Sequence, residues 1–378
     1  MSGRLRSAVA LTTGTAAGAS AVLALLVLAT VFVAVVTPRS SVAFRSRALQ
    51  QIFAATPPLG RSVIATSDFV SIANAVGVQP GPQGEVAPSQ LAKVGQEVAR
   101  NLAWRQVPLQ SRNHQWWGLT TGYSVIPGAS RHAYFGSAPP RVEVLYRPQL
   151  SRYARLVAGQ LPGLATLSAG GPVLPIAVTT ATASRFRLRV GSELAIPGSA
   201  VLKVSGIVRP VAPDAAFWQA DPGAAGATFN ASRSGSYWRG AVFVGSGEFG
   251  ELQAVLDTSQ MTVQWQYPLA LGGVGAGQAA ALNDHLGNAL TNGGLLTTSV
   301  QVIISVSLSC GLTGALSQFI AAEGRIGTLL ALLEVSLVIS GAVVLLLGCR
   351  LLAERRAGEF ALMRARGAGS GQLTALAL

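Results

Sequence analysis

The densest group of charged side chains in this sequence lies near its C-terminal end. Between Arg350 and Gly367, arginines and glutamates alternate with apolar residues at spacings that predict a short amphipathic helix. Gly367 is placed to end this helix as a left-handed cap, and Ser370 to begin another. Such a helix could bind a partner protein through its apolar side chains, or lie on anionic lipid through its arginines. The residues that would make these contacts are Glu354, Arg355, Arg356, Glu359, Phe360, Leu362, Met363 and Arg364.

The sequence offers little other chemistry. A Walker A phosphate loop requires Gly-Lys, and the two lysines, Lys93 and Lys203, follow Ala and Leu. There is no G-x-S-x-G nucleophile elbow, and the three histidines lack the spacing or cysteine partners of a zinc site. Cys310 and Cys349 would lie about 58 Å apart on a continuous helix, too far for a disulfide. We therefore expect a non-catalytic protein without a cofactor or metal.

Long apolar runs place two parts of the chain in a membrane. Half of the 378 residues are hydrophobic and 11% are charged, whereas soluble domains carry about 25% charged residues. Residues 8–37 contain no charged side chain, and roughly 20 apolar residues suffice to cross a bilayer. This run is longer than the hydrophobic region of a signal peptide, so we interpret it as transmembrane helix 1, an uncleaved anchor after a cytoplasmic segment, 1–7. A second run, Ile326–Gly348, is interrupted only by Glu334 and lies within a stalk and transmembrane helix 2 at 321–349.

The topology of these runs follows from the arginines. Five arginines come after the second run, so the positive-inside rule makes its C-terminal end cytoplasmic. An even number of spans then places both termini in the cytoplasm and the central domain outside, in a multi-pass protein of the cell membrane. Val300–Ile320 could form a third span, but its serines, threonines and glycines favour a strand, Ser299–Leu308, running into a helix toward the second span. Glu334 either has a function inside the membrane, or packs against a helix or snorkels to the interface.

Residues 38–320, between the two runs, predict a large extracytoplasmic α+β domain. Apolar residues at helical spacing predict helices over Ala87–Ala103 and Ala276–Leu290, and short alternating runs predict strands. A length of about 280 residues exceeds the usual single core, so we expect a subdomain divide near residue 140. The expected strands are Arg141–Tyr146, Val173–Val178, Ser192–Ile196, Val201–Val208, Gly240–Val244 and Met261–Tyr267.

The basic and aromatic residues of this domain favour structural roles. The net charge of +13 comes from scattered arginines without a block of like charge, which does not favour binding of nucleic acid. The run Arg185–Arg189 alternates basic and apolar residues, as expected of a solvated face of a strand or helix end. Three aromatic pairs favour core packing or a membrane-interface belt over a carbohydrate- or lipid-contacting surface. These pairs are Trp116-Trp117, Phe217-Trp218 and Tyr237-Trp238.

The C-terminal segment resembles the signature of FtsX-like, MacB-type permeases, which are membrane subunits of ABC transporters. In that family the pattern E-R-R-x-E-[FIL]-A-L-[LM]-R-A-x-G-A-[ST]-x-x-Q-L follows the second transmembrane helix and forms the coupling helix. Gly358 and Gly369 are small departures from it. The matching residues are Glu354, Arg355, Arg356, Glu359, Leu362, Arg364, Ala365, Gly367, Ala368 and Gln372. The segments similar to the family's periplasmic core domain are Val157–Gly159, Arg189–Ser192 and Val204–Val208.

The resemblance implies a permease subunit that works by mechanotransmission. The coupling helix would dock on a separate ABC ATPase, and the subunit would form a homo- or heterodimer in the bilayer. Because such permeases have further spans, 350–378 would hold the coupling helix and the start of a third transmembrane helix, in the N-terminal part of a longer permease. The Arg-rich, Lys-poor composition is similar to that of actinobacterial proteins. The rival function is a bitopic cell-envelope binding or regulatory protein without an ATPase partner.

Overall fold

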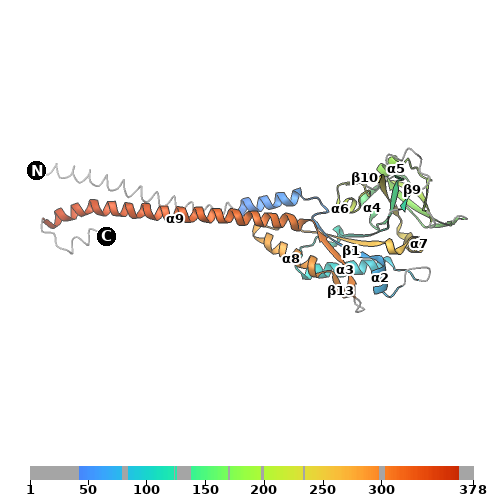
Figure 1. The fold of residues 1–378 in the computed structure, drawn as a ribbon, viewed down its shortest axis with the longest axis horizontal. Helices are drawn as coiled ribbons and strands as arrows, with labels where there is room; N and C mark the ends of the chain where they lie inside the picture. The colour runs from blue at the N-terminus through green and yellow to red at the C-terminus, as the bar shows by residue number, and fades with distance from the viewer. Residues whose placement is uncertain are drawn as a thin grey trace. The chain divides into compact units, whose positions relative to one another are not determined.

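The computed structural model describes residues 42–78, 84–122, 124–125, 138–168, 171–196, 200–232, 235–297 and 303–365. It divides into two units (Figure 1). Ala48–Gln318 form one unit, called the sheet domain below, and the two ends of the chain, up to Arg47 and from Phe319, form the other. The predicted first transmembrane helix, residues 8–37, lies outside the described residues and stays a prediction.

The sheet domain is built on a 13-stranded mixed sheet. All its pairings are antiparallel except β4 with β11 and β7 with β9, which are parallel. Its main path runs through β15 (Ser307–Cys310), β1 (Ser62–Asp68), β12 (Thr262–Pro268), β2 (Trp116–Thr120), β4 (Arg141–Tyr146), β11 (Gly235–Val244), β7 (Gly171–Thr179), β9 (Ala200–Pro210) and β5 (Ala154–Gly159). The strands beside this path are β3 (Ser124–Val125), β6 (Thr166–Ser168), β8 (Glu193–Ile196) and β10 (Thr228–Ser232).

The remaining elements lie against this sheet or between its strands. The helices of the sheet domain are α2 (Phe69–Ala75), α3 (Pro88–Trp104), α4 (Leu150–Tyr153), α5 (Thr180–Phe186), α6 (Ala216–Gln219), α7 (Phe249–Val255) and α8 (Ala279–Asn292). Single 3-10 turns are η1 (Arg112–His114), η3 (Ser246–Glu248), η4 (Thr258–Gln260) and η5 (Ala276–Gln278). Residues 42–55 are also helical, and β13 (Leu295–Thr297) pairs with β14 (Ile303–Ser305) in a separate two-stranded sheet.

The six strands predicted between residues 141 and 267 are all present, with ends shifted by a few residues in five of them. Both predicted helices are present as well, as α3 and as η5 with α8. The predicted divide near residue 140 falls inside the sheet, because β4 pairs with β2 on one side and with β11 on the other.

The predicted strand over Ser299–Leu308 is two short strands instead of one. The chain changes its pairing partner at Val306, from β13 in the small sheet to β1 in the large sheet, and the Val306 N–H donates to the carbonyl of Gly294. Residues 298–302 lie outside the described part of the chain. The strand β15 then leads through Gly311 into α9 (Leu312–Ala365), which is the course from strand to helix that the sequence predicts.

The helix α3 packs on the sheet through its apolar face and through two hydrogen bonds. Leu91 and Val98 are buried on that face. The indole Nε1 of Trp265 donates to the Leu91 carbonyl at 3.0 Å, and the hydroxyl of Tyr267 donates to the Gly95 carbonyl at 2.6 Å. These bonds satisfy the buried polar atoms of the two aromatic side chains and fix the position of α3 over that strand.

A second core beside β4 encloses a buried arginine. Arg147 donates to the carbonyl of Phe217 and pairs with the carboxylate of Asp221. Its guanidinium lies 4.4 Å from the ring centroid of Trp116 and 4.8 Å from that of Phe217. Burial lowers the pKa of Arg147 to about 9, and the nearby charge of Glu143 opposes this effect. The core aromatics Trp116, Phe217 and Trp218 are buried, so core packing is confirmed for them.

The other unit contains most of α9, which has 54 residues in all. Figure 1 shows α9 as one unbroken helix. Residues 312–350 have a mean hydropathy of 2.6 in their most apolar window, and none of that window is buried. Among the described residues this is the one helix long and apolar enough to cross a membrane. Within this unit Arg45 lies 3.9 Å from Glu323, in a partly exposed ion pair.

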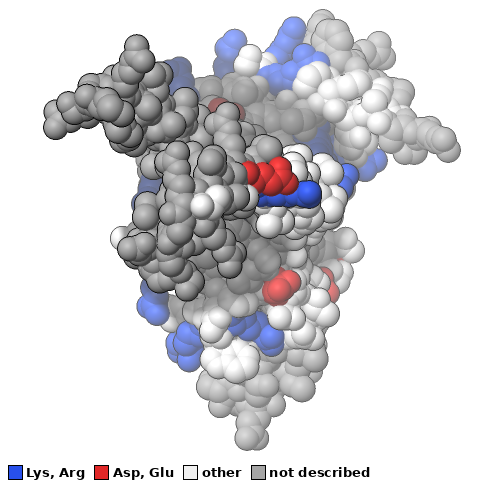
Figure 2. Space-filling view, turned by 90° about the vertical axis from the view of Figure 1, so that its left-hand side faces the viewer, with Lys and Arg blue, Asp and Glu red and all other residues white. Residues whose placement is uncertain are grey.

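Basic side chains are spread over the described surface in Figure 2 instead of gathering in one large patch. This agrees with the scattered arginines of the sequence. In the predicted solvated run, Arg187 and Arg189 are exposed and Phe186 is buried, as the alternation indicates. Arg185 differs, because its guanidinium stacks 3.6 Å from the ring centroid of Trp238.

Candidate functional site

The predicted coupling residues lie at the C-terminal end of α9. The sequence predicts a short amphipathic helix here, and in the structure the helical residues after Arg350 continue from the apolar stretch without a break. The reason is local, because α9 contains no proline and its isolated glycines, Gly358 included, each cost only about 1 kcal/mol. Gly367, the predicted cap, lies outside the described residues. On this helical stretch lie Glu354, Arg355, Arg356, Glu359, Phe360, Leu362, Met363 and Arg364.

Glu354 is the coupling residue whose side-chain contact the structure describes. The Arg350 Nε–H donates to its Oε1 at 3.0 Å, across one helical turn. Both side chains are well exposed, so the pair adds at most a few tenths of a kcal/mol to helix stability. Glu334 is exposed within the apolar stretch, about 24 Å along the axis from Arg350. Both roles predicted for Glu334 therefore stay open.

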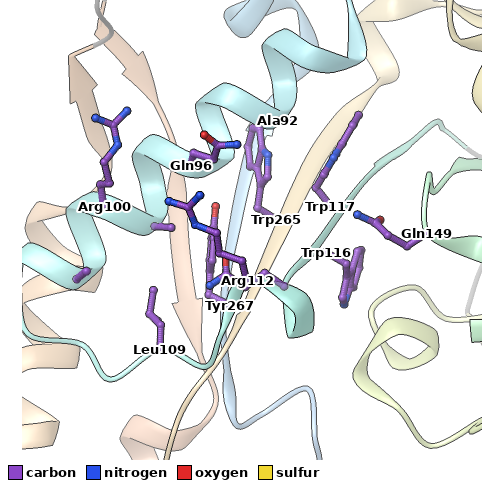
Figure 3. A pocket seen from close by; sticks show the side chains of 13 residues that line it. Ala92, Gln96, Arg100, Leu109, Arg112, Trp116, Trp117, Gln149, Trp265 and Tyr267 are labelled. Carbon is purple, nitrogen blue, oxygen red and sulfur yellow. The ribbon is translucent and has the colours of Figure 1, made fainter. Parts of the chain in front are cut away.

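The sheet domain contains a pocket of about 430 Å³ between α3, η1 and the strands β2 and β12. Figure 3 shows α3 crossing the face of β12, with the rings of Trp265 and Tyr267 beneath it and Trp117 beside them. Trp117 and Trp265 face each other as paired residues of neighbouring strands. The pocket is lined by Ala92, Gln96, Ala99, Arg100, Ala103, Leu109, Arg112, Gln115, Trp116, Trp117, Gln149, Trp265 and Tyr267.

Two polar atoms of the pocket residues are buried without a hydrogen-bond partner among the described residues. They are the Oε1 of Gln149 and the indole Nε1 of Trp116, whose ring packs in the second core with Phe217. The arginines of the lining are exposed: Arg112 has no ion-pair partner in the described part of the chain, and Arg100 lies 3.5 Å from Glu97. The pocket thus combines an aromatic floor with donors and positive charge at its rim.

This pocket was not predicted from the sequence. The pattern of α3 was visible, but nothing local indicated that Trp117 pairs with Trp265 on a strand far along the chain. Trp117 is only half-buried, unlike its neighbour Trp116, so the two members of this aromatic pair differ in role. Adjacent residues of a strand point to opposite faces of the sheet, which explains why Trp116 and Trp117 have different surroundings.

A buried carboxyl group lies elsewhere in the sheet domain, at the start of α7. Glu248 is fully buried, and its Oε2 accepts a hydrogen bond from the Gly245 N–H at 3.1 Å. Its Oε1 is buried without a partner among the described residues. Burial raises the pKa of Glu248 to about 7; the Gly245 hydrogen bond lowers it and the charge of Glu251 raises it further. This group therefore titrates near neutral pH.

Among the described residues, no three His, Cys, Asp or Glu side chains form a group that could hold a metal ion. Cys310 and Cys349 are both free thiols, one buried and one exposed. A second cavity of about 590 Å³ lies beside β9 and the loop after β5, and Lys203 is the charged residue in its lining.

Comparison with solved structures shows a weak similarity to a permease domain. The chain is similar to the crystal structure of a domain of a protein assigned as a permease from Porphyromonas gingivalis, with 13% sequence identity and a TM-score of 0.26. The match covers 67% of this chain and 91% of that domain. No protein-family model and no curated protein matches the sequence.

Proposed function

We propose that this chain is the membrane subunit of an ABC transporter of the FtsX/MacB type. In this proposal it is a non-catalytic permease subunit that couples ATP hydrolysis by a separate ATPase to movement of the sheet domain outside the cell. The observation that carries the proposal is α9. One unbroken helix begins next to a strand of the sheet, contains the apolar stretch and ends in the segment that resembles a coupling helix.

The start of α9 is firmly held within the sheet domain. Leu312 and Leu316 are fully buried there. The preceding strand β15 pairs with β1 over four residues, with Cys310 opposite Val63. Because α9 is one continuous helix from Leu312 to Ala365, we propose that a displacement of its cytoplasmic end acts on β15 and the edge of the sheet. This supports mechanical coupling as the mechanism.

The cytoplasmic end of α9 would supply the contact with the ATPase. Phe360, Leu362 and Met363 would enter a groove of the ATPase, while Arg355 and Arg356 would steer the encounter. The membrane topology proposed for this function has both termini in the cytoplasm and a second permease subunit, identical or related, beside this one.

The second candidate is a bitopic cell-envelope binding protein without an ATPase. The observation that favours it is the pocket beside α3, which belongs wholly to the sheet domain and would work without a coupling helix. In this case the arginines after Arg350 would only hold the helix end on anionic lipid.

The experiment that separates the two candidates is charge reversal in the coupling segment. The variant Arg355→Glu/Arg356→Glu is purified from its native host in mild detergent, and the ATP hydrolysis that copurifies is measured. The matched control, Arg187→Glu/Arg189→Glu, makes the same charge change at exposed positions of the sheet domain. Protease accessibility of the sheet domain in intact cells reports topology.

The transporter proposal predicts that the coupling variant loses at least tenfold of the copurifying ATPase activity with its topology unchanged, and that the control keeps it. An unchanged ATPase activity in the coupling variant, or a variant that alters topology alone, would reject ATPase docking through these arginines.

A further inference from the structure

We propose that the pocket between α3, η1 and β12 binds a small soluble anion with a flat apolar body, such as an aromatic carboxylate. This site belongs to the sheet domain alone, so the proposal holds whether or not the chain has an ATPase partner. Its volume of about 430 Å³ lies within the range of about 300–1,000 Å³ that is typical of small-molecule sites.

The walls of the pocket favour a flat apolar body. The half-buried Trp117 presents an aromatic ring, and Ala99 on α3 is a small residue of the same lining. Trp265 and Tyr267 are each 2% exposed beneath α3, and their polar atoms are bound to carbonyl groups of α3, so they complete an apolar floor and offer the ligand no hydrogen bond. Stacking on such rings adds about 0.5–1.5 kcal/mol beyond the burial of area for an aromatic partner.

The charges at the pocket favour an anion. Its lining contains two arginines, Arg100 and Arg112, and no Asp or Glu. Figure 3 shows the guanidinium of Arg112, which comes from η1, directed toward α3. Arg112 has no ion-pair partner in the part of the chain that is described, and Arg100 has a weak one in Glu97 at 3.5 Å. A carboxylate can accept two parallel hydrogen bonds from a guanidinium, which makes it the matching group.

The amide of Gln149 is a further polar group beside the aromatic rings. It projects toward Trp117 in Figure 3, and its Oε1 is buried without a described partner. A buried acceptor without a partner costs about 1–3 kcal/mol, and a ligand that supplies a donor recovers part of that cost.

The test measures binding of naphthalene-2-carboxylate to the full chain in nanodiscs of phosphatidylcholine, by calorimetry with empty nanodiscs subtracted. Naphthalene-2-methanol has the same ring and no charge, so it isolates the contribution of the anion. The charge variant is Arg112→Gln, and its matched control is Arg209→Gln, an exposed arginine of β9 outside the pocket lining. The filling variant is Ala99→Trp, with Gln96→Trp as a second one at an exposed position of the same helix.

We expect the wild type to bind the carboxylate at least tenfold more tightly than the alcohol. Arg112→Gln reduces this preference to less than threefold and leaves binding of the alcohol unchanged, while Arg209→Gln changes neither. Both filling variants, checked for an unchanged thermal unfolding midpoint, abolish binding of either compound. Equal affinity for the two compounds, or undiminished binding in a folded filling variant, would overturn the proposal. So would displacement of the carboxylate when anionic lipid replaces part of the phosphatidylcholine, since the occupant would then be a lipid headgroup.

Discussion

The buried carboxyl group of Glu248 predicts how the stability of the sheet domain depends on pH. Its pKa is about 7 in the folded protein and 4.5 as the ordinary value. Below pH 4.5 the group is protonated in both the folded and unfolded states and does not affect stability. Between pH 4.5 and 7 the unfolded state releases the proton and the folded state keeps it, so the free energy of unfolding falls as pH rises.

The size of this effect follows from the shift of about 2.5 pKa units. At about 1.36 kcal/mol per unit, ionised Glu248 costs the folded state about 3 kcal/mol at pH 8. Glu248→Gln has the same shape, can still accept the hydrogen bond from Gly245, and does not ionise. The variant should therefore match the wild type near pH 4.5. At pH 8 it should unfold at a midpoint higher by roughly 6–12 °C, given about 2–4 °C per kcal/mol for a domain of this size.

The assay is thermal unfolding of the full chain in detergent, followed by intrinsic fluorescence at pH values from 4.5 to 8. Glu251→Gln is the control, because Glu251 is exposed and contributes only the smallest of the effects on the Glu248 pKa. It should move the midpoint at pH 8 by much less than Glu248→Gln does. If the wild type and Glu248→Gln lose stability in parallel between pH 4.5 and 8, the reasoning from burial is refuted.

Three further predictions concern the cores of the sheet domain. Asp221→Ala leaves Arg147 buried without its counter-charge, so chemical denaturation should show a loss of about 3–5 kcal/mol, and a loss below 1 kcal/mol would contradict the buried pair. Gly95→Ala places a Cβ against the indole ring of Trp265 beneath α3 and should cost about 1–3 kcal/mol of unfolding free energy by the same measurement. The control Gly277→Ala has open space around its Cβ and should cost little. Equal effects of the two substitutions would refute this packing. Cys310 is buried and burial raises the pKa of its thiol, so N-ethylmaleimide at pH 7.5 should modify it only after unfolding; prompt modification in the folded chain would contradict its burial.

The sequence predicted those strands and helices whose signal is local. The alternation in Arg141–Tyr146 gave a strand with the same ends as β4, and the spacing of Leu91 and Val98 gave α3. Several strands were missed, β1 and β5 among them. The sequences of β1, SVIATSD, and of the edge strand β5, ARLVAG, show no clear alternation of apolar and polar residues. Local pattern also gave the apolar stretch of α9 and the amphipathic helix after it, but it did not show that the two form one continuous helix.

The pocket could not be predicted, because it depends on contacts between distant parts of the chain. Arg112 and Trp117 come together with Trp265 and α3 only through the pairing of β2 with β12. The order of strands in the sheet depends likewise on pairings such as that of β1 with both β12 and β15, which lie far along the chain. The coupling role of the residues in the C-terminal segment comes from the resemblance alone and stays a proposal.

The most direct test of the central claim is capture of the chain from native membranes in mild detergent, with an antibody to the sheet domain, followed by peptide mass spectrometry. The account predicts that a protein with a Walker A motif is recovered in near-stoichiometric amount, and that Arg355→Glu/Arg356→Glu reduces its recovery at least tenfold. Recovery of the chain without any such ATPase, under conditions that preserve a known ABC transporter in the same extract, would contradict the account and leave a cell-envelope binding protein.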